Sequence, residues 1–256
     1  MAWWSREGRG AAAHLQERAR ELARWHADAV ARSAAGEPTE AVPLFEEALE
    51  GCRTTLGPDN PDTLAVAGNL GVAYMTAGRY EDGIDLLSAN LTDRVRVFGD
   101  DDPRTLTAAD ALATAYRLAG KLDDAVALSG RVTAERRRTL GPAHPDTLTS
   151  RMGMALARGA AGDVGSALTL LKAALNDSEQ THGPRDPHTI ALRGNVGACQ
   201  ALVGRAEDAA ATFERAATDA SVLYGPKHPI TVELQEDMLY TSDVERFAIA
   251  GSPVAA

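Results

Sequence analysis

The sequence predicts an all-α protein, namely a right-handed α-solenoid of about five helix pairs followed by a terminal capping helix. Three observations carry this prediction. A nine-residue segment, first found at 56–64, occurs five times, and each copy begins 42 residues after the previous one. A glycine recurs at the same interval between the copies. The apolar residues in between recur at every third or fourth position, which is the spacing of a helix face.

The recurring segment is expected to end one helix and to begin the next. In its first copy, Gly57 follows a predicted helix, and Asn60 stands directly before Pro61. Glycine closes a helix with little strain, an asparagine or aspartate side chain caps the next helix, and proline suits the first helical position. The later copies place other residues before the proline, namely Asp102, His144, Asp186 and His228.

The unit at 61–98 shows how each helix pair is expected to form. Its first helix runs from Pro61 to about Ala77, and Gly78 ends it. Its second helix runs from about Tyr80 to Val97, because apolar residues fall on one helical face at spacings of three and four. These residues are Tyr80, Ile84, Leu87, Leu91, Val95 and Phe98. In the third unit, Ser129, Thr133 and Arg137 occupy such apolar positions. That unit's second helix is therefore predicted to be the least tightly held.

We expect one repeat domain over 11–248, with repeats at about 18–57, 61–99, 103–141, 145–183 and 187–225 and a cap at 229–248. Residues 1–10 and 249–256 are expected to be disordered. Two tryptophans, Trp3 and Trp4, lie in the first of these segments. Either they cover an apolar groove or drive self-association, or they belong to a plain disordered end.

One unit resembles the tetratricopeptide repeat (TPR) in the order and spacing of its residues. The residues that carry the resemblance are Asn69, Leu70, Gly71, Tyr74, Gly78, Gly83 and Leu87. The segment at 140–148 reads Leu-Gly-Pro-Ala-His-Pro-Asp-Thr-Leu, and with the 42-residue period it resembles the kinesin-light-chain-like type of TPR. This type is common in bacterial TPR proteins linked to NB-ARC-type signalling ATPases. The resemblance implies a superhelix whose inner surface holds a peptide or partner segment.

Charge and composition narrow the class of partner. The net charge of −10 argues against broad nucleic-acid binding, which requires a positive surface. No apolar run is long enough to span a membrane, and Met1 to Gly10 lacks the apolar core of a secretory signal. We therefore expect a cytoplasmic protein that binds neither nucleic acid nor membrane, and its alanine and arginine richness hints at a bacterial source.

No group of residues suggests catalysis, a metal or a cofactor. The histidines are expected at surface or capping positions, and Cys52 and Cys199 are expected to be packed thiols rather than a disulfide or a nucleophile. The run Arg136-Arg137-Arg138 is interpreted as cations at a helix end, with phosphate binding as the alternative.

The informative surface is the inner face of the first helix in each pair. We predict that the partner contacts a set of residues on or beside this face: Asn69, Val72, Met75, Thr114, Arg117, Leu118, Arg151, Arg193 and Asn195. The resemblance implies that Asn69 and Asn195 hold a peptide backbone, although Ala111 and Gly153 interrupt the row. The arginines could take an acidic side chain. Alternatively, the small residues of this face merely permit tight winding.

The sequence thus predicts a non-enzymatic scaffold or adaptor that binds a protein or peptide in the concave groove. The alternative is a regulatory sensor that responds to a peptide or ligand and acts on an effector chain. An enzyme on a helical scaffold is the third hypothesis, and no cluster of acids, bases or metal ligands supports it. Self-association is left open.

Overall fold

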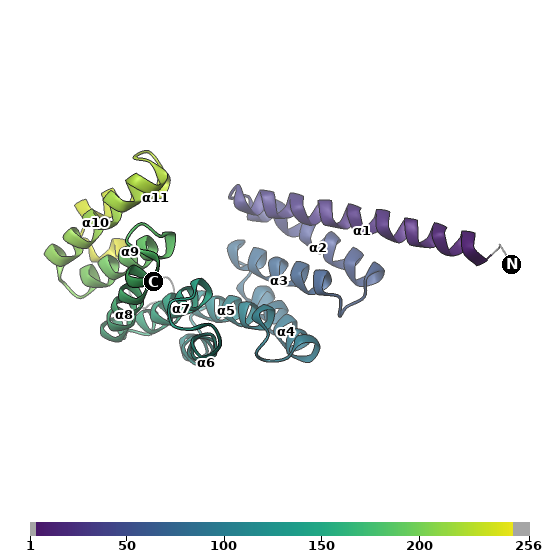
Figure 1. The fold of residues 1–256 in the computed structure, drawn as a ribbon, viewed down its shortest axis with the longest axis horizontal. Coiled ribbons are helices and arrows are strands. Elements are labelled where there is room, and N and C mark those ends of the chain that lie inside the picture. The colour runs from purple at the N-terminus through teal and green to yellow at the C-terminus, as the bar shows by residue number, and fades with distance from the viewer. Residues whose placement is uncertain (1–3, 248–256) are drawn as a thin grey trace. The chain divides into compact units, whose positions relative to one another are not determined.

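The structure is a computed structural model that describes residues 4–247, and within that range it contains helices and no strand (Figure 1). The all-α prediction is therefore confirmed. The helices are α1 (Trp4–Ala34), α2 (Pro38–Thr55), α3 (Pro61–Thr76), α4 (Tyr80–Phe98), α5 (Pro103–Leu118), α6 (Leu122–Leu140), α7 (Pro145–Ala160), α8 (Val164–His182), α9 (Pro187–Leu202), α10 (Ala206–Tyr224), α11 (Pro229–Leu239) and the 3-10 helix η1 (Val244–Phe247).

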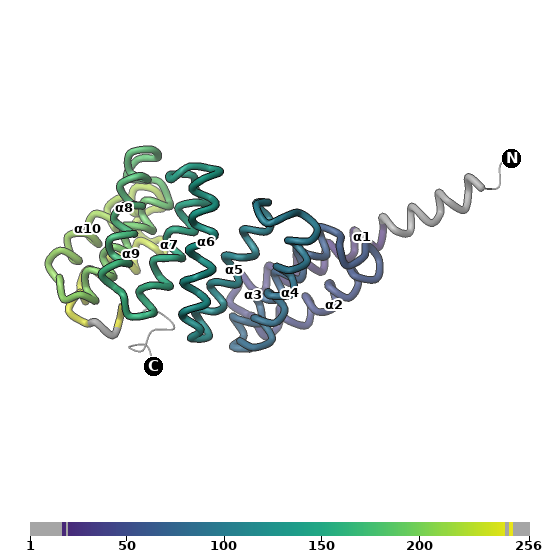
Figure 2. Tube along the Cα trace, turned by 90° about the horizontal axis from the view of Figure 1, so that it is seen from below, coloured from purple at the N-terminus to yellow at the C-terminus, as the bar shows by residue number. Residues whose placement is uncertain are grey.

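Contacts divide the chain into two compact units, one up to Ala115 and one from Tyr116 onward. In the first unit α1 packs against α2, α2 against α3, and α3 against α4. In the second unit each helix from α6 to α11 packs against the next, as the side-by-side tubes of α7 to α10 in Figure 2 show. The sequence analysis expected one domain over 11–248. Two units are compatible with stacked repeats, because each repeat contacts only its neighbours.

The recurring segment forms helix ends as expected. Asn60 accepts a hydrogen bond from the backbone N–H of Asp62 at 2.8 Å, and the same capping bond occurs at all four later copies. The two histidines cap through Nδ1, as His144 does at 3.2 Å. Every described glycine at the two recurring positions has a positive φ, with 93° at Gly57 and 77° at Gly78. These glycines therefore close the helices in the conformation that L side chains avoid.

Small residues allow the two helices of a pair to approach closely. A Cβ atom on Gly71 of α3 would lie 2.6 Å from Cγ of Leu87 on α4. At the matching position three repeats later, Gly197 lies under the ring of Phe213, whose nearest atoms are 3.0 Å from where a Cβ would be. The large side chain on the second helix thus occupies the space beside the glycine of the first helix.

The third repeat is polar inside as well as outside. Ser129 and Thr133 of α6 are buried, and the Thr133 hydroxyl donates to the carbonyl of Ser150 on α7 at 3.1 Å. Arg136 is only 4% exposed, and its guanidinium donates to the carbonyl of Asp146 and to the Ser150 hydroxyl. The run lies at the end of α6 as predicted, with Arg137 and Arg138 in its last turn, but the Arg136 side chain is buried against α7. Arginine is rarely buried unless it is paired in this way.

The two ends also differ from expectation. Helix α1 begins at Trp4, so residues 4–10 continue a helix instead of forming a disordered end. At the other end α11 stops at Leu239, and η1 follows as a separate turn whose Phe247 ring stacks on Phe213 at 5.5 Å. The predictions for Trp3, for the Trp4 side chain and for the tail at 249–256 lie outside the described residues.

Candidate functional site

The predicted binding residues of the first unit lie on α3, but they do not all share one face. Asn69 is exposed, and Val72 is 43% exposed. Met75 is buried at 6% exposure, and its Sδ atom would lie 2.6 Å from a Cβ on Gly83 of α4. At about 100° per residue, Met75 is a third of a turn away from Asn69 around the helix. The expectation that Met75 contacts a ligand is therefore wrong, because this side chain packs between the two helices of its own pair.

The two asparagines occupy the same position, three repeats apart, and each joins neighbouring first helices. Nδ2 of Asn69 lies 2.7 Å from Nε2 of His26 on α1. Nδ2 of Asn195 on α9 donates to Sδ of Met152 on α7 at 3.3 Å and to the carbonyl of Ala191 at 2.9 Å. In both cases the bonds engage the amide N–H groups, and no described residue donates to the side-chain oxygen. Each asparagine therefore keeps an acceptor for a ligand.

The burial of His26 makes the first unit sensitive to pH. Burial lowers the pKa of His26 below 6.5, and the nearby carboxylate of Asp62 offsets this only in part. The unfolded chain therefore binds more protons than the folded chain when the pH lies between the lowered pKa and 6.5. Stability is complete above pH 6.5 and is lost as the pH falls through that window.

We expect the variant His26→Gln to show a flatter dependence of melting temperature on pH between pH 5 and 8 than the wild type. Glutamine keeps a hydrogen-bonding group near Asn69 but does not titrate. Thermal melts of both proteins over this range, with matched buffers, provide the comparison. Equal slopes for the two proteins would show that His26 does not carry the effect.

The residues predicted on α5 have mixed exposure. Thr114 is exposed, and Arg117 and Leu118 are half-buried. Burial lowers the pKa of the Arg117 guanidinium from its ordinary value. Their role in binding stays a prediction.

The remaining two predicted arginines are internal to the second unit. Arg151 of α7 is 7% exposed, and its guanidinium donates to Asp177 of α8 at 2.7 Å and to the carbonyl of Pro142. Arg193 of α9 is 1% exposed and bridges Asp219 of α10 at 2.7 Å and Glu179 of α8 at 2.6 Å. Neither guanidinium is available to an acidic ligand, so that prediction is wrong. Because the carboxylate partner lies 26 residues later in each case, only the packed helix pair brings the charges together.

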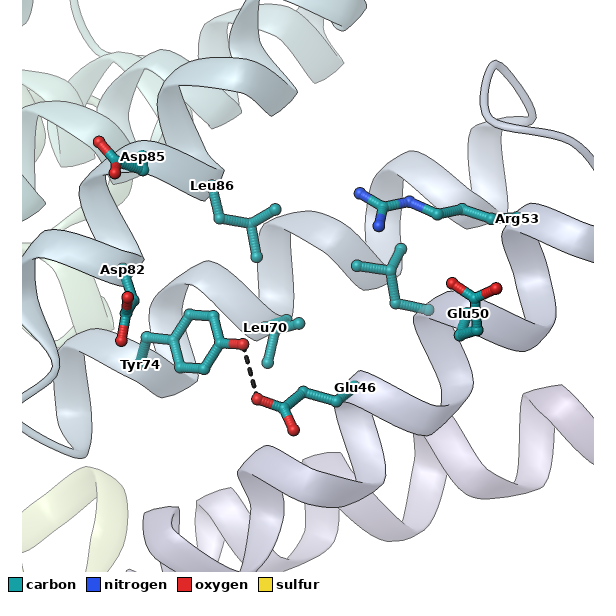
Figure 3. A pocket seen from close by; sticks show the side chains of 9 residues that line it. Glu46, Glu50, Arg53, Leu70, Tyr74, Asp82, Asp85 and Leu86 are labelled. Carbon is teal, nitrogen blue, oxygen red and sulfur yellow. Dashed lines mark hydrogen bonds between the residues drawn. The ribbon is translucent and has the colours of Figure 1, made fainter.

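A cavity of about 390 Å³ opens on the side of the first unit where α2, α3 and α4 meet. Figure 3 shows its walls, with the Tyr74 hydroxyl turned toward Glu46, to which it donates at 2.7 Å. Four carboxylates and one guanidinium surround an apolar floor, so the cavity is acidic. Its lining residues are Glu46, Leu49, Glu50, Arg53, Leu70, Tyr74, Asp82, Asp85 and Leu86.

A second cavity, of about 330 Å³, lies where α8, α9 and α10 of the second unit meet. It is the same repeat feature, since Leu175, Val196 and Asp208 each stand 126 residues, or three periods, after a residue that lines the first cavity. Its lining residues are Lys172, Leu175, Glu179, Arg193, Val196, Gln200, Asp208, Ala211, Thr212 and Arg215. Two of these residues carry a carboxylate and three carry a cationic group, so its charges are more balanced than those of the first cavity.

Neither cavity was predicted from the sequence. The walls of each cavity come from three helices, and part of each wall is a face of a second helix that the apolar pattern assigns to solvent. The one predicted residue that lines either cavity is Arg193. A comparison of polar residues across equivalent repeat positions would have given a hint, since Tyr74 and Gln200 interrupt an otherwise apolar stripe.

Both cysteines of the chain lie inside the fold. Cys52 and Cys199 are both free and buried, and burial raises the pKa of the Cys199 thiol to about 11 and that of Cys52 in the same direction. A thiol with a raised pKa is a poor nucleophile, which fits packed cysteines. Between residues 4 and 247, no three His, Cys, Asp or Glu side chains gather as metal ligands. No described helix is both long and apolar enough to cross a bilayer.

Comparison with known proteins agrees with this architecture. A tetratricopeptide repeat family model matches residues 25–82, 65–134 and 146–220. A solved structure of a Podosopora anserina protein assigned as a kinesin light chain, with nearly identical TPR-like repeats, has 26% identity and a TM-score of 0.68 over 79% of this chain and 95% of that chain. BtubC (BKLC) from P. vanneervenii has 20% identity and a TM-score of 0.65 over 90% and 95%.

A third structure is that of the Rap conjugation gene regulator of the plasmid pLS20 in complex with the Phr* peptide. It has 12% identity and a TM-score of 0.61, over 85% of this chain and 63% of that chain. At this identity the likeness concerns the fold alone. No curated protein matches the chain.

Proposed function

We propose that this chain, which belongs to the tetratricopeptide repeat family, is an adaptor. The family model matches more than half of the chain. The adaptor holds a peptide or partner segment on the exposed face of the first helices of its pairs, which we call the A-helix face. Each unit has its own A-helix face, which we define as the exposed side of α3 in the first unit and the exposed sides of α7 and α9 in the second. TPR folds serve as protein-interaction scaffolds, and the family membership supports that role in general. The position of the ligand on this face is the proposal.

The observation that supports this proposal is the pair of asparagines at equivalent repeat positions, Asn69 and Asn195. Each uses its N–H groups to join neighbouring first helices and leaves its oxygen without a donor from the described residues. A side-chain oxygen in that position can accept from the backbone N–H of an extended peptide. Val72, one turn from Asn69, is 43% exposed and offers an apolar contact beside it.

Crosslinking can test the position of the partner directly. A photo-crosslinking residue at Val72 on the A-helix face should capture a partner from the source cell that mass spectrometry identifies. The matched control is the same residue at Val222, which is 58% exposed on the second helix α10. Capture of the same partner from Val222 and not from Val72 would contradict the proposal.

The affinity of the captured partner should then fall when the asparagines are removed. Replacing Asn69 and Asn195 with alanine is expected to weaken binding by about 1–3 kcal/mol, because polar groups of the partner lose their acceptor. Calorimetry with the purified partner measures this loss. The control replaces Arg137 and Arg138 with alanine, since both are exposed on the second helix α6 and should leave affinity unchanged. Full affinity in the asparagine variant, with loss in the arginine variant, would move the site away from the A-helix face.

A regulatory sensor is the second candidate function. The observation in its favour is that proteins of similar fold include the Rap conjugation gene regulator, whose structure holds a peptide. A sensor should change its dimensions when the captured partner binds, and small-angle scattering measures such a change. If the scattering curve of the protein does not change when the partner binds, the sensor is excluded and the adaptor remains the proposed function.

A further inference from the structure

Helix α11 is the first helix of a pair that has no second α-helix in the part of the chain that the structure describes (Figure 1). One side of α11 packs against α10, and Thr231 and Leu234 are buried there. Another side carries Val232, Gln235 and Leu239, whose spacing of three and four residues places them on one stripe of the helix. All three are exposed, Val232 at 39% and Leu239 at 71%. We call these three residues the open face of α11.

In α9 the matching residues face the second helix of the pair, α10. They stand 42 residues earlier and are Ile190, Arg193 and Gly197. Ile190 and Arg193 are each 1% exposed, and Gly197 lies under the ring of Phe213 on α10. The repeat therefore assigns the open face of α11 to contact with another helix.

Leu239 excludes a second helix at the spacing of the earlier pairs. The earlier residues at its position are all glycine or alanine, namely Gly71, Ala113, Ala155 and Gly197. A single Cβ atom on Gly71 would already lie 2.6 Å from the side chain of Leu87 on α4. A leucine at this position requires a partner helix that lies farther away and places a smaller residue opposite it.

A second copy of α11 meets these requirements. When two α11 helices run antiparallel about a two-fold axis between positions 235 and 236, Leu239 of each copy lies opposite the smaller Val232 of the other. The two Gln235 side chains meet near the axis, and their amides are self-complementary because each carries a donor and an acceptor. A contact that joins identical surfaces in this way is the commonest form of homodimer.

The charges around α11 suit the same arrangement. Lys227 precedes the helix and Asp243 follows it, and both are exposed without an ion-pair partner among the described residues. An antiparallel pair places Lys227 of each copy at the same end as Asp243 of the other, which gives two attractive contacts. Glu236 lies close to its equivalent at the axis, and Arg246 of its own copy, 3.3 Å away, compensates its charge.

We propose that two copies of this chain form a dimer through the open face of α11, with the two helices antiparallel. The helix has 11 residues and is about 16 Å long, so we expect a contact smaller than the roughly 1,200–2,000 Å² of stable interfaces. The dimer therefore dissociates on dilution. Because the A-helix face lies on other helices, this proposal goes beyond the proposed function, and either one can fail without the other.

Sedimentation velocity of the full chain, from low micromolar to several hundred micromolar protein, tests for the dimer. The wild type should sediment faster as its concentration rises. In the variant Leu239→Glu the association should weaken at least about tenfold, because each dimer would bury two carboxylates against valine. Leu239 is 71% exposed, so this variant should keep the wild-type melting temperature at concentrations where the wild type is monomeric.

The matched control for a charge on an exposed apolar position is Val222→Glu. Val222 is 58% exposed on α10. Polar residues occupy its position in the earlier repeats, namely Thr54, Arg96, Arg138 and Gln180. The fold therefore tolerates a polar side chain there, and this variant should associate as the wild type does.

Engineered cysteines test the two-fold axis. Gln235→Cys should give a covalent dimer on mild oxidation, because equivalent residues of two copies approach each other only near the axis. The control is Glu233→Cys, which is exposed on the same helix at the position of Ala191, a residue that is also exposed in α9. Both native cysteines are buried, so they should not crosslink.

A charge exchange tests the antiparallel direction. Lys227→Glu alone should weaken the dimer, because two like charges then meet at each end of the contact. Lys227→Glu combined with Asp243→Lys should restore it. A double variant as weak as the single one would refute the antiparallel arrangement.

Three further results would overturn the proposal. One is a wild type that stays monomeric at every concentration, which would leave the open face to a partner of different sequence. Another is a dimer of equal strength in Leu239→Glu and Val222→Glu, which would place the contact elsewhere. The third is covalent dimer formation that is as fast in Glu233→Cys as in Gln235→Cys.

Discussion

Replacing Arg193 with methionine is expected to lower the free energy of unfolding of the second unit by about 3–5 kcal/mol. The Arg193 side chain is 2% exposed and neutralises both Asp219 and Glu179, which are themselves partly buried at 18% and 33% exposure. Without the guanidinium, Asp219 on α10 and Glu179 on α8 lose their buried counter-charge and keep only exposed arginines at 3.8 Å. Urea unfolding of the variant and the wild type measures the difference.

Two exposed arginines that approach the same carboxylates serve as matched controls. Arg185 lies 3.8 Å from Asp219 and is 63% exposed, and Arg215 lies 3.8 Å from Glu179 and is 69% exposed. Solvated ion pairs are worth at most about 1 kcal/mol, so Arg185→Met and Arg215→Met should change stability little. If Arg193→Met were no more harmful than these two variants, the buried network would not stabilise the unit.

The variant Leu171→Ala should cost about 2–5 kcal/mol, because it leaves a void in the core of the second unit. Leu171 is 1% exposed and packs in a cluster with Leu148, Ala155 and Val196. Leu128 on α6 is half-buried, and Leu128→Ala should therefore cost less. Comparable losses for the two leucines would contradict the prediction that the second helix of the third repeat is the least tightly held.

Damage from Leu171→Ala should also stay local, because a repeat contacts only its neighbours. Hydrogen exchange followed by mass spectrometry should show faster exchange in α7, α8 and α9, and unchanged exchange in α2 and α3 of the first unit. Uniformly faster exchange along the whole chain would show that the protein unfolds as one cooperative block.

The helix pairs and their ends could be predicted from the sequence because they depend on local chemistry. The first helix of the type unit was expected from Pro61 to about Ala77, and α3 ends at Thr76. Gly57 and Gly78 adopt positive φ, as their role at helix ends required. A cap, a proline and a closing glycine act within a few residues, and the repeat supplies five copies of each for comparison.

The destination of long side chains could not be predicted in this way. Met75 and Arg193 were expected to contact a ligand, and both are buried between helices. The helical period places a residue on one side of its helix only to within about a third of a turn, and a guanidinium reaches several ångströms beyond its Cα. Whether such a group meets water or a carboxylate 26 residues away depends on the packing of the next helix.

The sequence by itself therefore determined the fold class, the repeat and the helix boundaries, because these follow from periodicity and from local capping. Only the tertiary structure decided which polar groups are satisfied internally and which remain open. Tyr74 and Gln200 illustrate the difference, since they occupy the same repeat position and both lie on a first helix. One finds a partner on the preceding second helix and the other does not, because hydrogen bonding depends on the facing side chain, and that side chain changes from repeat to repeat.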